Sequence, residues 1–257
     1  MDNSVFTSGA YVKSSSENCF IFSKYFGCLA KEGNSTLYGY DTQAHPSHAG
    51  EKIELSGGSF YGYVIQGHIH LKTGRNGKRI GRGEAFSVPA EFTCTIAKNT
   101  KFFVIKQEEN KSMHCIIKVE PSGGRLRYID GCTDTLLISP TVIGEPCLNA
   151  LYMPQGINQT MHTHPSCRMG CIFSGTGQAI TPLEELELAK GDLFYLATEQ
   201  AHKFRTDRSG QYMKIVAFHP DSDFGPGHDD HPMVNLTMVN GVSAREISDI
   251  RTTETPE

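Results

Sequence analysis

Two similar stretches decide the fold: "YVIQGHIHLKTGRNGKRIGRGEAFSVPA" (63–90) and "CIFSGTGQAITPLEELELAKGDLFYLAT" (171–198). Each begins with an apolar run that ends at a glycine, and a second glycine followed by an acidic residue comes 16 residues later. These glycines are Gly67 and Gly83 in the first copy and Gly175 and Gly191 in the second. The copies are offset by 108 residues, and such a repeat predicts one structural unit built twice.

Each copy consists of short apolar runs separated by glycine turns, with no helical period. This pattern predicts strands rather than helices. Many short strands joined by turns are typical of an all-β sandwich or barrel. We therefore predict two tandem β-domains, residues 1–118 and residues 119–257, each of ordinary domain size.

Composition excludes several classes of partner. The formal net charge is -4, from 24 basic and 28 acidic residues that are interspersed, so no basic stripe is present to bind nucleic acid. No apolar run is long enough to span a membrane, and the N-terminus lacks the pattern of a secretion signal. We expect a cytoplasmic protein whose 8 cysteines are free thiols, since none forms a C-x-x-C pair.

Immediately before the second copy, "QTMHTHPSCRMGCIFSGTG" (159–177) places His162 and His164 one residue apart. Alternate residues of a strand point to the same face, so both imidazoles can converge on one ion. His202, which follows the Gly191 turn, is a third candidate ligand. An isolated H-x-H pair is more often just hydrogen-bonded, but the third histidine favours a metal site.

The second copy resembles the cupin superfamily. Cupins carry a first motif G-x5-H-x-H-x3,4-E-x6-G and a second motif G-x5-P-x-G-x2-H-x3-N. Gly156, the histidine pair and Gly175 match the first motif, and Gly191 and His202 match the second. Three positions depart from the pattern: Arg168 replaces the glutamate, Ala197 the proline and Glu199 the glycine. The resemblance implies two tandem cupin barrels (double-stranded β-helix, or jelly roll), that is, a bicupin, with a divalent metal on three histidines.

The first copy serves as a control for the metal site. At the 108-residue offset, His162 corresponds to Glu54, His164 to Ser56, Arg168 to Phe60 and His202 to Cys94. An apolar side chain at the fourth position favours a filled structural barrel with a degenerate metal site. We expect this barrel to pack, to form a homodimer or to shape the entrance of the other pocket.

Arg168 cannot replace the motif glutamate as a ligand, because a guanidinium has no available lone pair. Two interpretations stay open. If the side chain points inward, it could hold an anionic substrate in a bidentate pair. If it turns outward, it pairs with a surface carboxylate.

Other candidates for chemistry lie close by. Tyr195 and Glu199 precede His202, where a general acid, base or fourth ligand could reach the metal. The segment "FHPDSDFGPGHDDHP" holds His219, His228 and His231. Its composition favours a surface loop, with a lid or a further metal site as the alternative.

Two classes of function remain. The first is a metal-dependent enzyme acting on a small polar molecule, with an anionic one favoured and a non-haem iron dioxygenase ahead of an isomerase or lyase; three-histidine cupins include iron dioxygenases. The second is a non-catalytic module that binds a small ligand. Fe(II) is favoured only through the resemblance, since imidazoles also bind Zn, Mn, Ni or Cu. No attached output domain is recognisable, which favours the enzyme.

Overall fold

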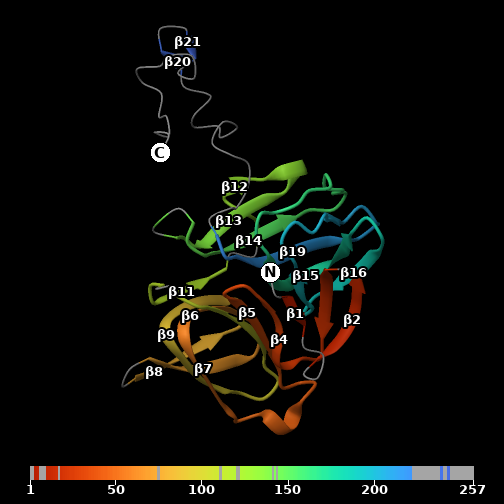
Figure 1. Ribbon diagram of the computed structural model, residues 1–257. Helices are drawn as coiled ribbons and strands as arrows, with labels where there is room; N and C mark the ends of the chain where they lie inside the picture. The colour runs from red at the N-terminus through yellow and green to blue at the C-terminus, as the bar shows by residue number, and fades with distance from the viewer. Residues whose placement is uncertain are drawn as a thin grey trace. The chain divides into compact units, whose positions relative to one another are not determined.

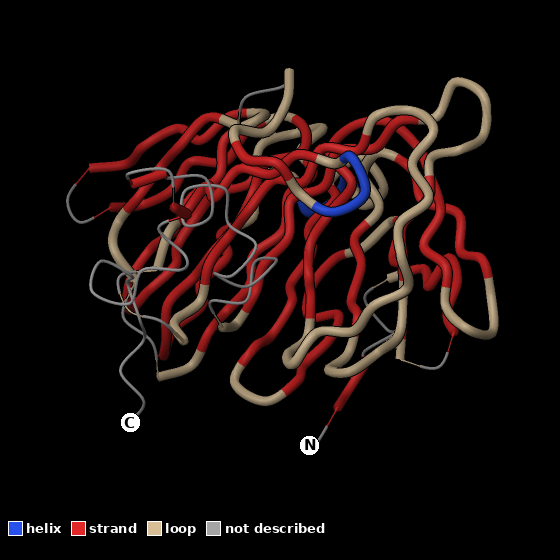
Figure 2. The backbone as a smooth tube through the Cα atoms, turned by 90° about the horizontal axis from the view of Figure 1, so that it is seen from above, coloured by secondary structure: helices blue, strands red, loops and turns tan. Residues whose placement is uncertain are grey.

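The structure is a computed structural model that describes residues 3–5, 10–16, 18–73, 76–109, 112–119, 122–140, 142, 144–221, 238–239 and 242–243. The chain divides into two compact units, Met1–Asp223 and Phe224–Glu257. The described part of the second unit is one pair of short strands, β20 (Met238–Val239) and β21 (Val242–Ser243). All that follows concerns the first unit, which is nearly all β, as predicted (Figure 2).

Within the described residues, nine strands form a first sheet in the order β1-β4-β5-β10-β6-β9-β7-β8, with β11 paired to β9 (Figure 1). These strands are β1 (Asn3–Val5), β4 (Phe26–Glu32), β5 (Ser35–Asp41), β6 (Lys52–Gln66), β7 (His68–Thr73), β8 (Asn76–Gly81), β9 (Glu84–Ile96), β10 (Lys101–Gln107) and β11 (Cys115–Lys118). A 3₁₀ turn, η1 (Pro46–His48), lies between β5 and β6.

Ten described strands form a second sheet in the order β12-β13-β14-β19-β15-β17-β3-β2, with β16 and β18 paired to β15. These strands are β2 (Tyr11–Ser16), β3 (Cys19–Ser23), β12 (Leu126–Arg127), β13 (Thr133–Ile138), β14 (Cys147–Met153), β15 (Arg168–Ile180), β16 (Glu185–Ala189), β17 (Leu193–Leu196), β18 (Lys203–Arg205) and β19 (Tyr212–His219). A second 3₁₀ turn, η2 (Ile129–Gly131), follows β12. All strand pairs in both sheets are antiparallel.

The internal repeat is visible in the strand pairing. Phe60 of β6 lies opposite Val88 of β9, and Arg168 of β15 lies opposite Leu196 of β17. Both pairs are related by the 108-residue offset seen in the sequence. The repeated turn at Gly175 requires glycine, because its φ is 81° and a Cβ there would clash with the carbonyl oxygen of Tyr212.

The two N-terminal strands β2 and β3 join the second sheet, although they precede every strand of the first sheet except β1. β3 pairs with β17, where Ile21 lies opposite Phe194, and β2 pairs with β3. These strands cover the backbone groups that β17 would otherwise expose at a sheet edge. The predicted division at residues 118 and 119 therefore does not separate the two sheets, and its bounds stay a prediction.

Three hydrophobic clusters hold the first unit together. One fills the first sheet's barrel and includes Phe60, Phe86 and Phe92. A second fills the barrel of the second sheet. The largest joins the two barrels, and in it the ring of Tyr61 lies 5.1 Å from that of Phe218. The outward faces of both sheets thus pack into one shared core.

The first copy lacks the ligand geometry of the second. Phe60 and Cys94 are fully buried among apolar side chains, whereas Glu54 is exposed and forms an ion pair with Lys52. The counterparts of the second copy's arginine and third histidine thus fill the barrel, and the counterpart of its first histidine faces solvent. The degenerate metal site expected there stays a prediction.

No helix among the described residues is long and apolar enough to cross a membrane.

Candidate metal centre

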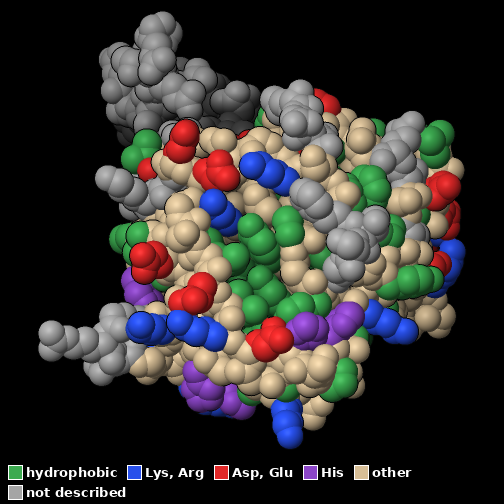
Figure 3. Space-filling model, turned by 60° about the horizontal axis from the view of Figure 1, so that its bottom comes forward, with side chains coloured by type: hydrophobic (Ala, Val, Ile, Leu, Met, Phe, Trp, Pro, Cys, Tyr) green, Lys and Arg blue, Asp and Glu red, His purple; other side chains and the backbone are tan. Residues whose placement is uncertain are grey.

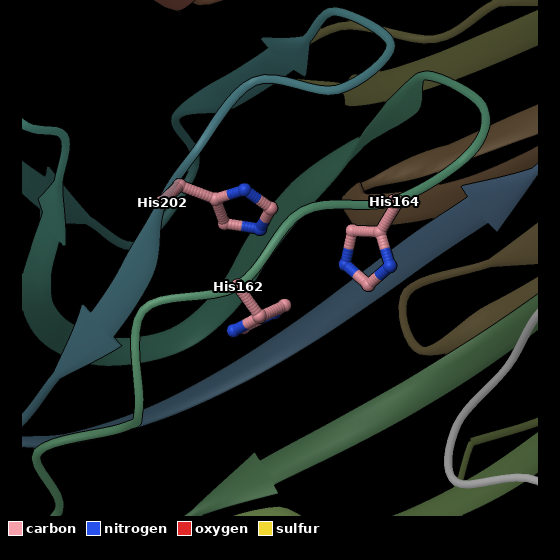
Figure 4. A group of neighbouring side chains, drawn as sticks. All are labelled: His162, His164 and His202. Atoms are coloured by element: carbon pink, nitrogen blue, oxygen red, sulfur yellow. The ribbon is translucent and has the colours of Figure 1, made fainter.

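Three histidines converge at one end of the second sheet's barrel. His162 and His164 lie in the segment before β15, and His202 lies directly before β18 (Figure 4). Their ring centroids are 4.7 to 5.2 Å apart, and one nitrogen from each ring lies within 4.8 Å of the other two. Among the described residues, this is the only group of three or more side chains placed to hold an ion.

Backbone pairing fixes these ligands in place. His162 and His202 form an isolated antiparallel bridge in which each backbone N–H donates to the other's carbonyl, at 3.0 and 2.9 Å. The carbonyl of His164 accepts a hydrogen bond from the backbone N–H of Glu199 at 2.9 Å. The backbone at His162 thus forms a short bridge rather than a longer strand, and it keeps both histidines beside His202.

Two of the rings have a fixed tautomer. Nδ1 of His162 lies 2.8 Å from the carbonyl oxygen of Thr160, and Nδ1 of His202 lies 2.8 Å from that of Gln200. Since a carbonyl only accepts, each Nδ1 carries the hydrogen and Nε2 keeps its lone pair. Hydrogen bonds of this kind orient imidazole ligands in known metal sites.

His202 is the most enclosed of the three, with 2% of its surface exposed. Its pKa is lowered to about 3, chiefly by burial and also by the nearby His162, His164 and Arg168, against a hydrogen bond to the Gln200 carbonyl that raises it. The ring is therefore neutral at physiological pH, which is the form that binds metals.

The histidines line a pocket of about 440 Å³ of atom-free space, part of it open to solvent. The wall is mostly apolar, with a few polar side chains among the aromatic and aliphatic ones. Besides the three histidines it consists of Tyr128, Asn149, Leu151, Gln159, Arg168, Phe194, Leu196, Phe204, Ile215, Ala217 and His219. A small set of polar groups in an apolar cavity is the usual composition of a small-molecule site.

Arg168 lies in the pocket wall, with its side chain 4% exposed. Its Nη1 donates to the carbonyl oxygens of Ser166 and Cys167, at 3.0 and 3.1 Å, and to the hydroxyl of Ser166 at 2.6 Å. The same atom lies 3.9 Å from Oδ1 of Asp221. The side chain thus lines the pocket and also faces a carboxylate, and its role toward a substrate stays a prediction.

Tyr195 and Glu199 do not reach the pocket, which corrects the catalytic roles expected of them. Strand alternation places Phe194 and Leu196 in the pocket wall, so Tyr195 points to the opposite face of β17. Glu199 is exposed on a turn with φ 58°, where only its backbone N–H contacts a ligand residue.

Sequence reasoning missed Glu32, at the end of β4 in the first sheet. This carboxylate is 5% exposed and accepts hydrogen bonds from the Tyr195 hydroxyl at 2.9 Å and from the Thr198 N–H at 3.3 Å. The thiol of Cys167 donates to it as well. The first barrel thereby holds the two segments that carry His164 and His202. No local pattern distinguishes this glutamate from an ordinary turn residue.

The remaining candidates divide into three cases. His219 is buried in the pocket wall with its ring 6.4 Å from that of His164, outside the group of three. His228 and His231 lie outside the described residues. All eight cysteines are free, as expected, and burial raises the pKa of Cys167 to about 12, so this thiol is not poised as a nucleophile.

Two pairs of histidines in the first barrel have ring contacts of their own, His45 with His48 at 6.2 Å and His68 with His70 at 5.1 Å. Figure 3 shows histidine side chains gathered at the surface of the face it draws. Neither pair belongs to a group of three ligands in the described chain. They offer no second metal centre of the same kind.

Asp134 lies behind the pocket wall, and burial raises its pKa to about 6, although hydrogen bonds from Asn149 and the Thr135 N–H lower it. A carboxyl whose pKa is higher in the folded state favours folding at low pH, and this contribution is lost as pH rises from about 4 to about 6. Asparagine does not titrate, so Asp134→Asn should lack this loss. Between pH 4 and pH 6 we expect its free energy of unfolding to rise by about 3 kcal/mol relative to that of the wild type. Urea unfolding at several pH values measures the difference, and a constant difference would contradict the prediction.

The fold and the site define a cupin-like β-barrel protein with a histidine triad. No protein-family model matches the chain, and no curated protein matches it at the sequence level. Solved structures do match. A cupin 2 conserved barrel domain protein from Leptotrichia buccalis is 15% identical, with a TM-score of 0.55 over 82% of this chain and 92% of that chain.

Two further matches are informative. The protein Ylba from E. coli is 16% identical, with a TM-score of 0.55 over 84% of this chain and 90% of its own. A salicylate 1,2-dioxygenase from Pseudaminobacter salicylatoxidans is 9% identical, with a TM-score of 0.52 over 78% of this chain and 71% of its own. At such identities these likenesses establish the fold alone.

Proposed function

We propose that this protein binds one divalent metal ion through Nε2 of His162, His164 and His202 and acts as a non-haem iron dioxygenase on a small anionic molecule. The observation that carries the proposal is the convergence of three imidazoles, two of them with Nδ1 held by a backbone carbonyl. Three neutral ligands leave the full charge of the ion and several coordination positions for other groups.

The residues of the chain have separate roles in this proposal. The three histidines hold the ion in the pocket, and the apolar wall around Phe194 and Leu196 restricts water beside it. Arg168 supplies positive charge on the same wall. Iron bound here would supply the one-electron chemistry that reaction with dioxygen requires.

A named dioxygenase among the structural neighbours supports oxygen chemistry over the alternatives. The test is oxygen uptake by the iron-loaded protein over a panel of small aromatic and aliphatic hydroxy acids and thiols. We expect uptake with at least one acid, and none after His164→Ala. Conversion of a substrate without oxygen uptake would instead indicate an isomerase or lyase. Binding of the acids without conversion would indicate a ligand-binding module.

Arg168 provides a second test, of the substrate's charge. Arg168→Lys keeps the charge but loses the fork geometry that pairs with a carboxylate. We expect KM for an acidic substrate to rise by about tenfold to a hundredfold, the effect of one charge-assisted hydrogen-bonded pair, with metal content unchanged. Steady-state kinetics at equal metal loading measures this, and an unchanged KM would remove the support for an anionic substrate.

A further inference from the structure

A second polar feature of the pocket has no role in metal binding. Asn149, on β14, lines the same cavity as the three histidines and is 3% exposed. Its Nδ2 donates to Oδ2 of Asp134 at 2.8 Å. Its Oδ1 is buried and has no hydrogen-bond partner among the described residues.

Asp134 determines which end of the amide faces the ligand. An ionised carboxylate only accepts, so the amide NH₂ turns toward Asp134 and the carbonyl oxygen is left for the pocket. Asp134 is held in turn by the backbone N–H of Thr135 at 2.7 Å. The two side chains therefore form a fixed pair that presents one acceptor.

A buried acceptor without a partner costs about 1–3 kcal/mol. The apolar residues of the wall, such as Leu151 and Ala217, supply no donor, and no polar group among the described residues reaches this oxygen. A group that enters the cavity with a donor recovers that cost when it binds, whereas an isosteric group without a donor does not. The position thus discriminates between ligands.

We propose that Oδ1 of Asn149 accepts a hydrogen bond from the molecule bound in this pocket, so that the ligand carries a hydroxyl, amine or amide N–H donor in addition to its metal-binding group. The proposal rests on the proposed function, because it takes the pocket to be the place where that substrate binds. It narrows the substrate class to small acids that bear a donor, such as hydroxy or amino acids.

Oxamate and oxalate are suitable probes, since they share one shape and one chelating edge. Oxamate has an NH₂ group where oxalate has an acceptor oxygen. Isothermal titration of both into the zinc-loaded protein at pH 8, well above the pKa of Asp134, gives the ratio of their Kd values. The ratio of Kd values in the wild type is then compared with the ratio in Asn149→Leu. The charge difference between the two probes affects both ratios equally and therefore cancels.

Asn149→Leu leaves the Asp134 carboxylate without its donor and can reduce stability. The double variant Asp134→Leu with Asn149→Leu removes both partners, which is close to neutral when shapes are kept. Melting temperature and zinc content are measured for all three proteins. The double variant provides the comparison if the single variant does not fold.

We expect the preference for oxamate over oxalate to fall about tenfold in the leucine variants, as the loss of one buried hydrogen bond predicts. An unchanged ratio in leucine variants that hold zinc would overturn the role of Asn149 but not the proposed function. It would mean that water satisfies Oδ1 of Asn149. Failure of the wild type to bind either probe while it holds zinc also counts against the inference. A wild type that takes up no zinc would overturn the proposed function as well.

Discussion

His164→Ala is expected to weaken metal binding at least ~100-fold, because even the loss of a hydrogen-bond partner behind a metal ligand costs 10- to 100-fold. His164 is half-buried, so its truncation leaves no enclosed cavity. The barrel should therefore stay folded. Metal analysis after dialysis, together with the melting temperature of the metal-free protein, measures the two effects separately.

His219→Ala is the matched control. Its ring also lies in the pocket wall, 6.4 Å from that of His164, but outside the group of three ligands. We expect this variant to keep its metal. Equal loss of metal in both variants would mean that His219 is a ligand, and full occupancy in His164→Ala would end the three-histidine account.

Phe60→Gln is expected to lower the free energy of unfolding by about 3–5 kcal/mol, the cost of removing a buried aromatic ring and burying an amide in its place. Phe60 is fully buried, with its ring 6.0 Å from that of Phe92 inside the first barrel. Urea unfolding measures the change. Folded protein should keep its metal, because Phe60 belongs to the barrel without the triad.

Glu54→Ala is the control for the first copy. Glu54 is exposed and paired with Lys52, and an exposed ion pair contributes at most about 1 kcal/mol. Stability and metal content should both stay close to the wild type. Loss of metal on changing either Phe60 or Glu54 would contradict a purely structural first barrel.

The sequence predicts the all-β fold and the metal triad because both depend on local spacing. Glycine turns and apolar runs of fixed length identify the repeat, and the register of Phe60 with Val88 and of Arg168 with Leu196 confirms it. The same repeat places His202 on a segment that pairs with the one carrying His162. This pairing accounts for the short distances among His162, His164 and His202.

The remaining features depend on contacts between distant segments. Strand β3 pairs with β17 of the second sheet, and Glu32 is buried against Tyr195. Both contacts join residues more than 160 positions apart. No pattern within either segment signals the partner. Tyr195 was expected at the site because it is near His202 in sequence, whereas strand alternation turns it to the opposite face.

X-ray absorption at the zinc edge of protein loaded with one equivalent of Zn²⁺ identifies the ligands of the ion. A three-histidine centre gives a shell of nitrogen and oxygen ligands at about 2.0–2.1 Å, with the scattering pattern of three imidazoles and no sulfur. The same spectrum of His164→Ala should show two imidazoles or no bound ion. A sulfur shell at about 2.3 Å, or fewer than three imidazoles in the wild type, would contradict a centre built from His162, His164 and His202.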